Sequence, residues 1–244
     1  MTLPSSTATP ARVLLARPEF RSLLGARALA ALGMSAIATV VAFQTWEVTG
    51  DPLSLGLLGL VEAIPALGLM LFGGHVADRR DRRSIILITG SMLALGALVL
   101  AFISTTGEGA SFAGILAVVF AIGVAAGFER PALVAFETQV IPIEHATRGA
   151  SLSGGAWTAA AIIGPAFGGI SIAFVGIPTT YLLIAVALGL SVILVSRISR
   201  KPMPEVEESE SVAHSLAGGV KYVAHHPVLL SSMALDLFAV FFGG

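Results

Sequence analysis

Six long apolar stretches determine what this chain can fold into. They cover residues 22–45, 54–75, 84–104, 111–129, 151–173 and 178–197. A seventh begins near Pro227 and runs to Gly244. A helix needs about 20 apolar residues to cross the bilayer core of about 30 Å. Because backbone groups in lipid must satisfy one another, and because these runs do not alternate as barrel strands do, we expect each stretch to be a transmembrane helix.

The composition agrees with a membrane protein. Of the 244 residues, 55% are hydrophobic and 12% are charged, whereas about 25% are charged in a soluble domain. The net charge of −1 gives no reason to expect nucleic-acid binding. Cysteine is absent, which excludes disulfides and thiolate metal sites. The polar, proline-containing first residues predict a short cytoplasmic tail without a cleaved leader.

Basic residues lie only at alternate ends of the predicted spans. The loops WEVTGDPLS, STTGEGAS and VGIPTT contain neither Lys nor Arg. Of the fourteen basic residues, Arg27 lies just inside the first span, and the other thirteen lie in the tail, the loop after the second span and the other connections or at their edges. Positive charge is retained on the cytoplasmic side of a membrane. We therefore expect a multi-pass protein of the cell (inner) membrane with a cytoplasmic N-terminus.

The pattern divides the chain into three segments. Residues 1–200 are predicted to form an all-α bundle of six transmembrane helices, residues 201–226 a cytoplasmic linker with a short amphipathic helix, and residues 227–244 the start of a seventh transmembrane helix. Six spans, a linker and a further span make half of a twelve-span plan, which is common among transporters. We expect the chain to be a fragment that lacks its C-terminal half.

A short charged segment after the second span is the most specific motif. Residues 74–83, GHVADRRDRR, resemble the signature between the second and third spans of the major facilitator superfamily. The matching residues are Gly74, Ala77, Asp78, Arg79, Arg82 and Arg83. Asp81 stands where that family usually has glycine. The resemblance implies a half of the twelve-helix major facilitator fold, with this segment as a gate.

In such a gate, Gly74 lets helices approach closely. The carboxylate of Asp78 accepts hydrogen bonds from the first turn of a neighbouring helix, and the arginines hold it through paired contacts. These contacts form and break as the cytoplasmic side closes and opens. The alternative is that the charges only determine topology.

The fifth span contains a second motif, GPAFGG at residues 164–169. It resembles the core of the antiporter signature of the same superfamily in Gly164, Pro165, Gly168 and Gly169. Ser151 and Ala160 replace two upstream glycines of the longer signature. The resemblance implies exchange of substrate for protons. The general pattern of the chain, including TGDPLSLGLLGLVEAIPALGL after the first span and DLFAVFFGG in the seventh, most resembles the exporter branch that contains macrolide and siderophore (enterobactin-type) exporters. The alternative is a proline kink that only helps packing.

Ionisable residues inside membrane spans are costly and usually functional. Glu62 lies about eight residues into the second span and is the best candidate for the proton or substrate path. The alternatives are that it pairs with Arg27 or lines water. Arg27 either snorkels to the interface or serves as a counter-charge. The role of Asp236, in the seventh span, depends on the missing half. An interfacial charge cluster is predicted for Glu129, Arg130 and Glu137, with a relay as the alternative.

These features predict a secondary active transporter that exports small amphipathic or drug-like compounds, or a siderophore, by alternating access. The expected partners are the lipid bilayer, a small-molecule substrate and H⁺ as coupling ion. No metal, cofactor or catalytic triad is predicted, and neither Lys201 nor Lys221 follows a glycine as in a phosphate-binding loop, so we do not expect an enzyme. The alternative is a non-transporting membrane protein or a half-transporter that needs a partner chain.

Overall fold

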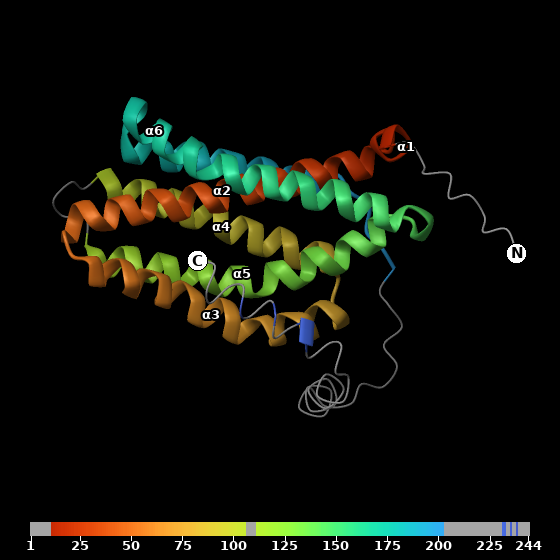
Figure 1. Cartoon of the computed structure of the whole chain (residues 1–244), viewed down its shortest axis with the longest axis horizontal. Helices are drawn as coiled ribbons and strands as arrows, with labels where there is room; N and C mark the ends of the chain where they lie inside the picture. Colours follow the sequence, from red (N-terminus) through yellow and green to blue (C-terminus); the bar gives the residue numbers. More distant parts are fainter. Residues whose placement is uncertain (1–10, 106–110, 203–230, 233–234, 236–237, 239–244) are drawn as a thin grey trace, which may run out of the picture. The chain divides into compact units, whose positions relative to one another are not determined.

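The computed structural model describes residues 11–105 and 111–202, together with residues 231, 232, 235 and 238. The chain divides into two units, Met1–Pro204 and Glu205–Gly244, and nearly all of the described residues belong to the first. Every regular element among them is a helix (Figure 1). The predicted all-α fold is thereby confirmed. Most of the predicted linker and seventh span, including Asp236, lies outside the described residues.

Five long helices account for most of the first unit. In chain order the elements are α1 Ala11–Leu15, α2 Pro18–Thr49, α3 Pro52–Arg79, α4 Arg82–Thr105, α5 Phe112–Val140, the 3₁₀ turn η2 Ile143–His145, and α6 Ala146–Ser196. Helices in α2, α3, α4, α5 and α6 are long and apolar enough to cross a membrane. They overlap the predicted spans and run several residues past most of their ends.

The element α6 consists of two helices that meet at Gly176. The φ of 77° and ψ of 170° at this residue lie in a region that is open essentially to glycine alone. A continuous helix of 51 residues would be about 77 Å long at 1.5 Å per residue, far more than one bilayer crossing. The fifth and sixth predicted spans therefore correspond to residues 146–175 and 177–196.

Packing against α2 shows that the chain reverses at Gly176. Gly164 and Gly168 lie against α2 in the order Leu32–Ser35 and then Ala36–Val40. The second part of α6 lies against α2 in the opposite order, with Leu188 at Gly33 and Leu194 at Gly25. The two parts of α6 are therefore antiparallel, and the bundle has six membrane-crossing helices within residues 11–202.

Two apolar clusters fill the bundle. The first contains Val40, Leu93, Ile122, Tyr181 and Ile184 among others. The second lies nearer the ends of the helices where the chain enters α2 and leaves α5, and it includes Leu23, Ile86, Phe136 and Val195. Each cluster draws on α2, α4, α5 and α6, so burial of apolar side chains holds these four helices together.

Helix α3 is attached differently from the other long helices. Only 17% of the residues in its most apolar window are buried, compared with 44% for α4. It packs closely on α5 at two glycines, which have no side chain to keep the helices apart. A Cβ added at Gly123 would lie 2.5 Å from the carbonyl oxygen of Glu62, and one at Gly127 would lie 3.0 Å from Cβ of Leu69. Backbone contact of this kind is typical of helix pairs in membranes.

Candidate functional site

The charged loop between α3 and α4 is held by Asp81. Its carboxylate accepts hydrogen bonds from the backbone N–H of Arg83, at 3.2 Å, and from Oγ of Ser84, at 2.7 Å. It therefore caps the first turn of α4. Arg80 is extended, with φ −125° and ψ 161°, so the turn is made without a residue at positive φ. The turn therefore forms without glycine at position 81, where the signature that it resembles usually has one, because the side chain of Asp81 caps the next helix.

The carboxylate of Asp78 points outward. It is 71% exposed, and its partner is Arg82, which lies one turn away at 3.7 Å. The predicted contact with the first turn of a neighbouring helix is not among the interactions that join described residues. Arg82 also donates from Nε to the carbonyl oxygen of Ala77, at 3.1 Å. Asp78 is thus held by a single long ion pair with Arg82, which belongs to the same motif.

One other residue of this motif, Arg83, is tied to the bundle, and the glycine that packs closely lies just outside the motif. The guanidinium of Arg83 donates to the carbonyl oxygen of Ser196, at 2.6 Å, and so joins the start of α4 to the end of α6. A Cβ added at Gly74 would meet nothing within 4 Å, whereas one at Gly73 would collide with the backbone at Gly127 on α5. Among the described residues, the close helix approach predicted for Gly74 is therefore made by Gly73.

The glycines of the fifth-span motif divide between two faces of α6. A Cβ added at Gly164 would lie 2.6 Å from Cβ of Ser35, and one at Gly168 would lie 3.2 Å from the carbonyl oxygen of Ala36. These two glycines therefore let α6 contact the backbone of α2. Gly169 has nothing within 4 Å of an added Cβ, and Pro165 is exposed. One face of the motif, with Gly164 and Gly168, therefore packs on α2, and the other face, with Pro165 and Gly169, is not covered by described residues.

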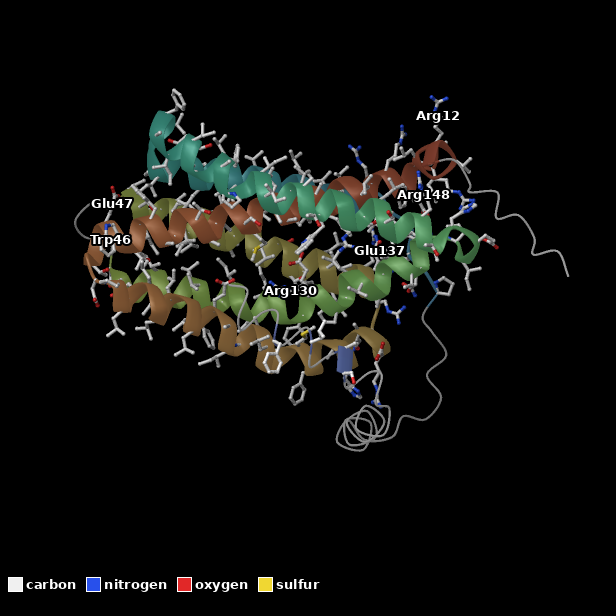
Figure 2. All side chains as sticks on the ribbon, viewed as in Figure 1. Arg12, Trp46, Glu47, Arg130, Glu137 and Arg148 are labelled. Atoms are coloured by element: carbon white, nitrogen blue, oxygen red, sulfur yellow. The ribbon has the colours of Figure 1, made fainter. Side chains whose placement is uncertain are left out.

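Arg27 pairs with Glu137, not with Glu62. The ion pair joins α2 to α5, and the two side chains are only 17% and 12% exposed. Arg27 is therefore a counter-charge, as one predicted alternative had it, but its partner was not foreseen. Figure 2 shows Glu137 toward the end of the bundle where Arg12 and Arg148 lie. We call this the Arg148 end and the opposite end, where Figure 2 shows Trp46 and Glu47, the Trp46 end.

Glu62 lies beside a cavity of about 200 Å³ between α2, α3 and α5. Of the ten residues that line the cavity, Glu62 is the one with an ionisable side chain, and the others are apolar or glycine. The aliphatic wall includes Met34, Ile37, Leu58 and Ile122. A half-buried carboxylate against an apolar wall can bind a cation or a proton in this position.

Glu129 is the residue that sequence reasoning misplaced. The sequence predicts it in an interfacial cluster at the end of the fourth span, but α5 continues to Val140 and Glu129 is only 8% exposed. Apolar residues at helical spacing continue past it as Ala132 and Phe136, which are both buried. That continuation puts Glu129 on the buried face of α5 and was the signal that could have located it.

Two buried polar groups lie at different levels of the bundle. Near the Trp46 end, the hydroxyl of Tyr181 donates to Oε1 of Gln44 at 2.9 Å, and Nε2 of Gln44 donates to Oγ of Ser104 at 2.9 Å. We call these three residues the tyrosine network. Between the two apolar clusters lie Thr89, Glu129 and Ser191, all buried, which we call the glutamate layer.

The segment after α6 is fastened to the Arg148 end of the bundle. Glu19 accepts a hydrogen bond from the backbone N–H of Ser199, at 3.1 Å, and pairs with Nζ of Lys201, at 2.6 Å. Nε2 of Gln139 donates to the carbonyl oxygen of Pro202, at 3.1 Å. These contacts place residues 199–202 against the ends of α2 and α5. Within the described part of the chain, no cluster of three His, Asp or Glu side chains is arranged for a metal ion.

Comparison with known proteins identifies the family. Residues 23–244 match the sequence profile of the Major Facilitator Superfamily. The chain belongs to the major facilitator superfamily. A crystal structure of an auto-inhibited POT family peptide transporter has a similar fold, with a TM-score of 0.65 and 14% identity over 78% of this chain and 40% of that chain. No curated protein matches the sequence.

Membership of the major facilitator superfamily confirms the prediction of a multi-pass membrane protein built as part of a major facilitator bundle. The family consists of transporters, which agrees with the prediction that the chain is not an enzyme. The chain spans less than half the length of the peptide transporter, and at 14% identity that likeness concerns the fold alone. The exporter branch, the substrate and the coupling ion stay predictions.

Proposed function

We propose that this chain is the N-terminal part of a secondary active transporter that exports small amphipathic or drug-like compounds, or a siderophore, in exchange for protons. Transport proceeds by alternating access, in which two six-helix bundles rock about a binding site near the bilayer midplane. This chain supplies the first bundle, and a C-terminal half beyond the present sequence supplies the second. Membership of a transporter family supports the proposal.

The cavity beside Glu62 is the observation that carries the proposal. Its aliphatic lining suits the apolar body of an amphipathic compound, and its carboxylate suits a cationic group or a proton. A carboxylate that binds substrate only when it has released its proton would link the two movements. We assign this exchange to Glu62.

The charged loop is proposed as the latch of the cycle. Asp78 is exposed and is held at 3.7 Å by Arg82, so a partner with better geometry can replace that contact. We assign that partner to the second bundle. In the same way, the uncovered face of α6 at Pro165 and Gly169 is assigned to contact with the second bundle. We assign the basic Arg148 end to the cytoplasmic side of the cell (inner) membrane, which makes the N-terminus cytoplasmic.

Transport by the full-length protein in inverted membrane vesicles tests the proposal. With an acidic interior, wild-type vesicles should accumulate a lipophilic cation such as ethidium, and Glu62→Gln should lose most of that uptake because the amide binds neither a proton nor a cation. Glu47→Gln is the matched control, since Glu47 is exposed at the Trp46 end. Equal uptake by the Glu62→Gln and wild-type proteins would remove Glu62 from the pathway.

Transport assays with a macrolide and with a siderophore, in addition to ethidium, separate the substrate classes. If the full-length protein transports none of them under a proton gradient, the exporter proposal fails in favour of a non-transporting role.

Asp78→Asn in the full-length protein tests the latch. Efflux from cells should fall at least several-fold while the amount of protein in the membrane stays the same, because the neutral amide cannot form an ion pair with an arginine. Asp51→Asn is the control: Asp51 caps α3 at the other end of the bundle, and asparagine is an equally good capping residue. Unchanged drug resistance with Asp78→Asn would leave the loop with topology as its role.

A further inference from the structure

Glu129 is a buried acid for which the proposed cycle has so far no use. It lies in the glutamate layer, with 8% of its surface exposed, between the two apolar clusters. Its Oε1 lies against Gly90 of α4, where an added Cβ would be 3.9 Å away. At that distance an added Cβ would be in ordinary van der Waals contact with the carboxyl group, whereas it would lie 2.9 Å from Cγ2 of Val192, so the missing side chain at Gly90 mainly leaves room for Val192.

The hydroxyls of the glutamate layer donate their hydrogen bonds elsewhere. Oγ1 of Thr89 donates to the carbonyl oxygen of Ile85, at 3.0 Å, one turn earlier in its own helix. Oγ of Ser191 donates to the carbonyl oxygen of Ala26, at 2.9 Å. Among the described residues no donor is bonded to the Glu129 carboxyl group. A charged carboxylate without donors is strongly disfavoured in such a place.

The described arginines near this level do not bond to the Glu129 carboxyl group either. Arg27, on α2, is paired with Glu137. Arg130 follows Glu129 in sequence and attracts its charge, but its side chain is exposed. Helix α3 passes α5 at Gly73, and the titratable residue nearest to that contact in sequence is the half-buried His75. At this level α4 and α6 contribute Gly90, the two hydroxyls and Val192.

We infer that Glu129 is a second proton-binding site of the transporter. Its carboxyl group is neutral inside the bundle and releases its proton when the helices around Gly90 separate. In that step its O–H bond breaks, the proton passes to a water molecule that enters from the opened side, and the carboxylate remains. This inference rests on the proposed transport function, but the proton site can be tested without transport.

Infrared difference spectroscopy of the full-length protein in lipid provides that test. A change of pH should produce a protonated-carboxyl band that is lost in Glu129→Gln and kept in the control Glu47→Gln. Gly90→Ser should place a hydroxyl beside the carboxyl group and lower the frequency of the band, because a hydrogen bond weakens the C=O bond. Gly90→Ala has a Cβ at the same place without a hydroxyl and should lower it less.

The outcomes separate the inference from the proposed function. A band that depends on Glu129 and responds to Gly90→Ser supports the proton site, even if no compound is transported. If Glu129→Gln leaves every carboxyl band unchanged, or if Gly90→Ser and Gly90→Ala give the same spectrum, the inference is wrong. In transport, Glu129→Gln should flatten the pH profile of uptake, and an unaltered profile beside normal uptake would contradict a coupling role.

Discussion

The two ends of the bundle handle buried polar groups in different ways. At the Trp46 end, the tyrosine network joins Tyr181, Gln44 and Ser104 by neutral hydrogen bonds of 2.9 Å. Toward the Arg148 end, the buried polar groups include ionisable ones: Arg27 pairs with Glu137, and Glu129 has no bonded donor among the described residues. Neutral networks rigidify a structure, whereas ionisable groups respond to protons and to movement. The contrast predicts that the Arg148 end is the moving end.

Breaking the Arg27–Glu137 pair should have the largest effect. Arg27→Leu leaves the Glu137 carboxylate buried without its counter-charge and should lower the free energy of unfolding by about 3–5 kcal/mol. The double variant Arg27→Leu/Glu137→Leu should recover most of this loss, because no lone charge remains. Reversible denaturation of the full-length protein in mixed micelles measures both. A loss no larger than that of a neutral hydrogen bond would contradict the contrast between the two ends.

Breaking the tyrosine network should have an intermediate effect. Tyr181→Phe removes the donor to Oε1 of Gln44 and should cost about 1–3 kcal/mol, the usual penalty for a buried acceptor without a partner. Tyr181→Phe/Gln44→Leu should be milder than the single variant, because Ser104 keeps its hydrogen bond to the carbonyl oxygen of Leu100. The same denaturation measurement applies. The transport rate of Tyr181→Phe should stay near the wild-type value, and a large fall would place the moving parts at the Trp46 end.

The cap of α4 should have the smallest effect of the three. Asp81→Ala removes the acceptor for the backbone N–H of Arg83 and should cost about 1 kcal/mol. Asp81→Gly, which restores the residue usual in the family, should cost only a few tenths of a kcal/mol, and Asp81→Asn should be close to neutral. A penalty for glycine as large as that for alanine would show that Asp81 does more than cap the helix, for instance through Arg200, which lies 3.9 Å from it.

Several features of the site were predictable because they depend on local chemistry. The run of charges at residues 78–83 indicated a membrane exit, and in the structure it spans the end of α3, the two-residue turn and the start of α4. The glycines of the fifth-span motif indicated close helix contact, which Gly164 and Gly168 make with α2. The same reasoning chose Gly74 over Gly73, since adjacent glycines look alike until the orientation of the helix is known.

The partner of each buried charge was not predictable. Arg27 and Glu137 are 110 residues apart, and Glu62 was an equally reasonable partner in sequence. Glu129 and Arg130 resembled the end of a span because two adjacent charges usually lie in water. In the structure the helix continues, and the two side chains separate, one buried and one exposed, because consecutive helical residues point about 100° apart.

The amino-acid sequence by itself determined the number of membrane crossings and the segregation of basic residues to one end, because lipid imposes those properties on each segment independently. Only the tertiary structure decided that Gly176 separates two antiparallel helices whose faces both pack on α2, that Arg27 neutralises Glu137, and that the buried Glu129 lies beside Gly90. These are contacts between distant segments, and they depend on how each helix is rotated about its axis. The apolar pattern constrains that rotation weakly when a helix is apolar on every side.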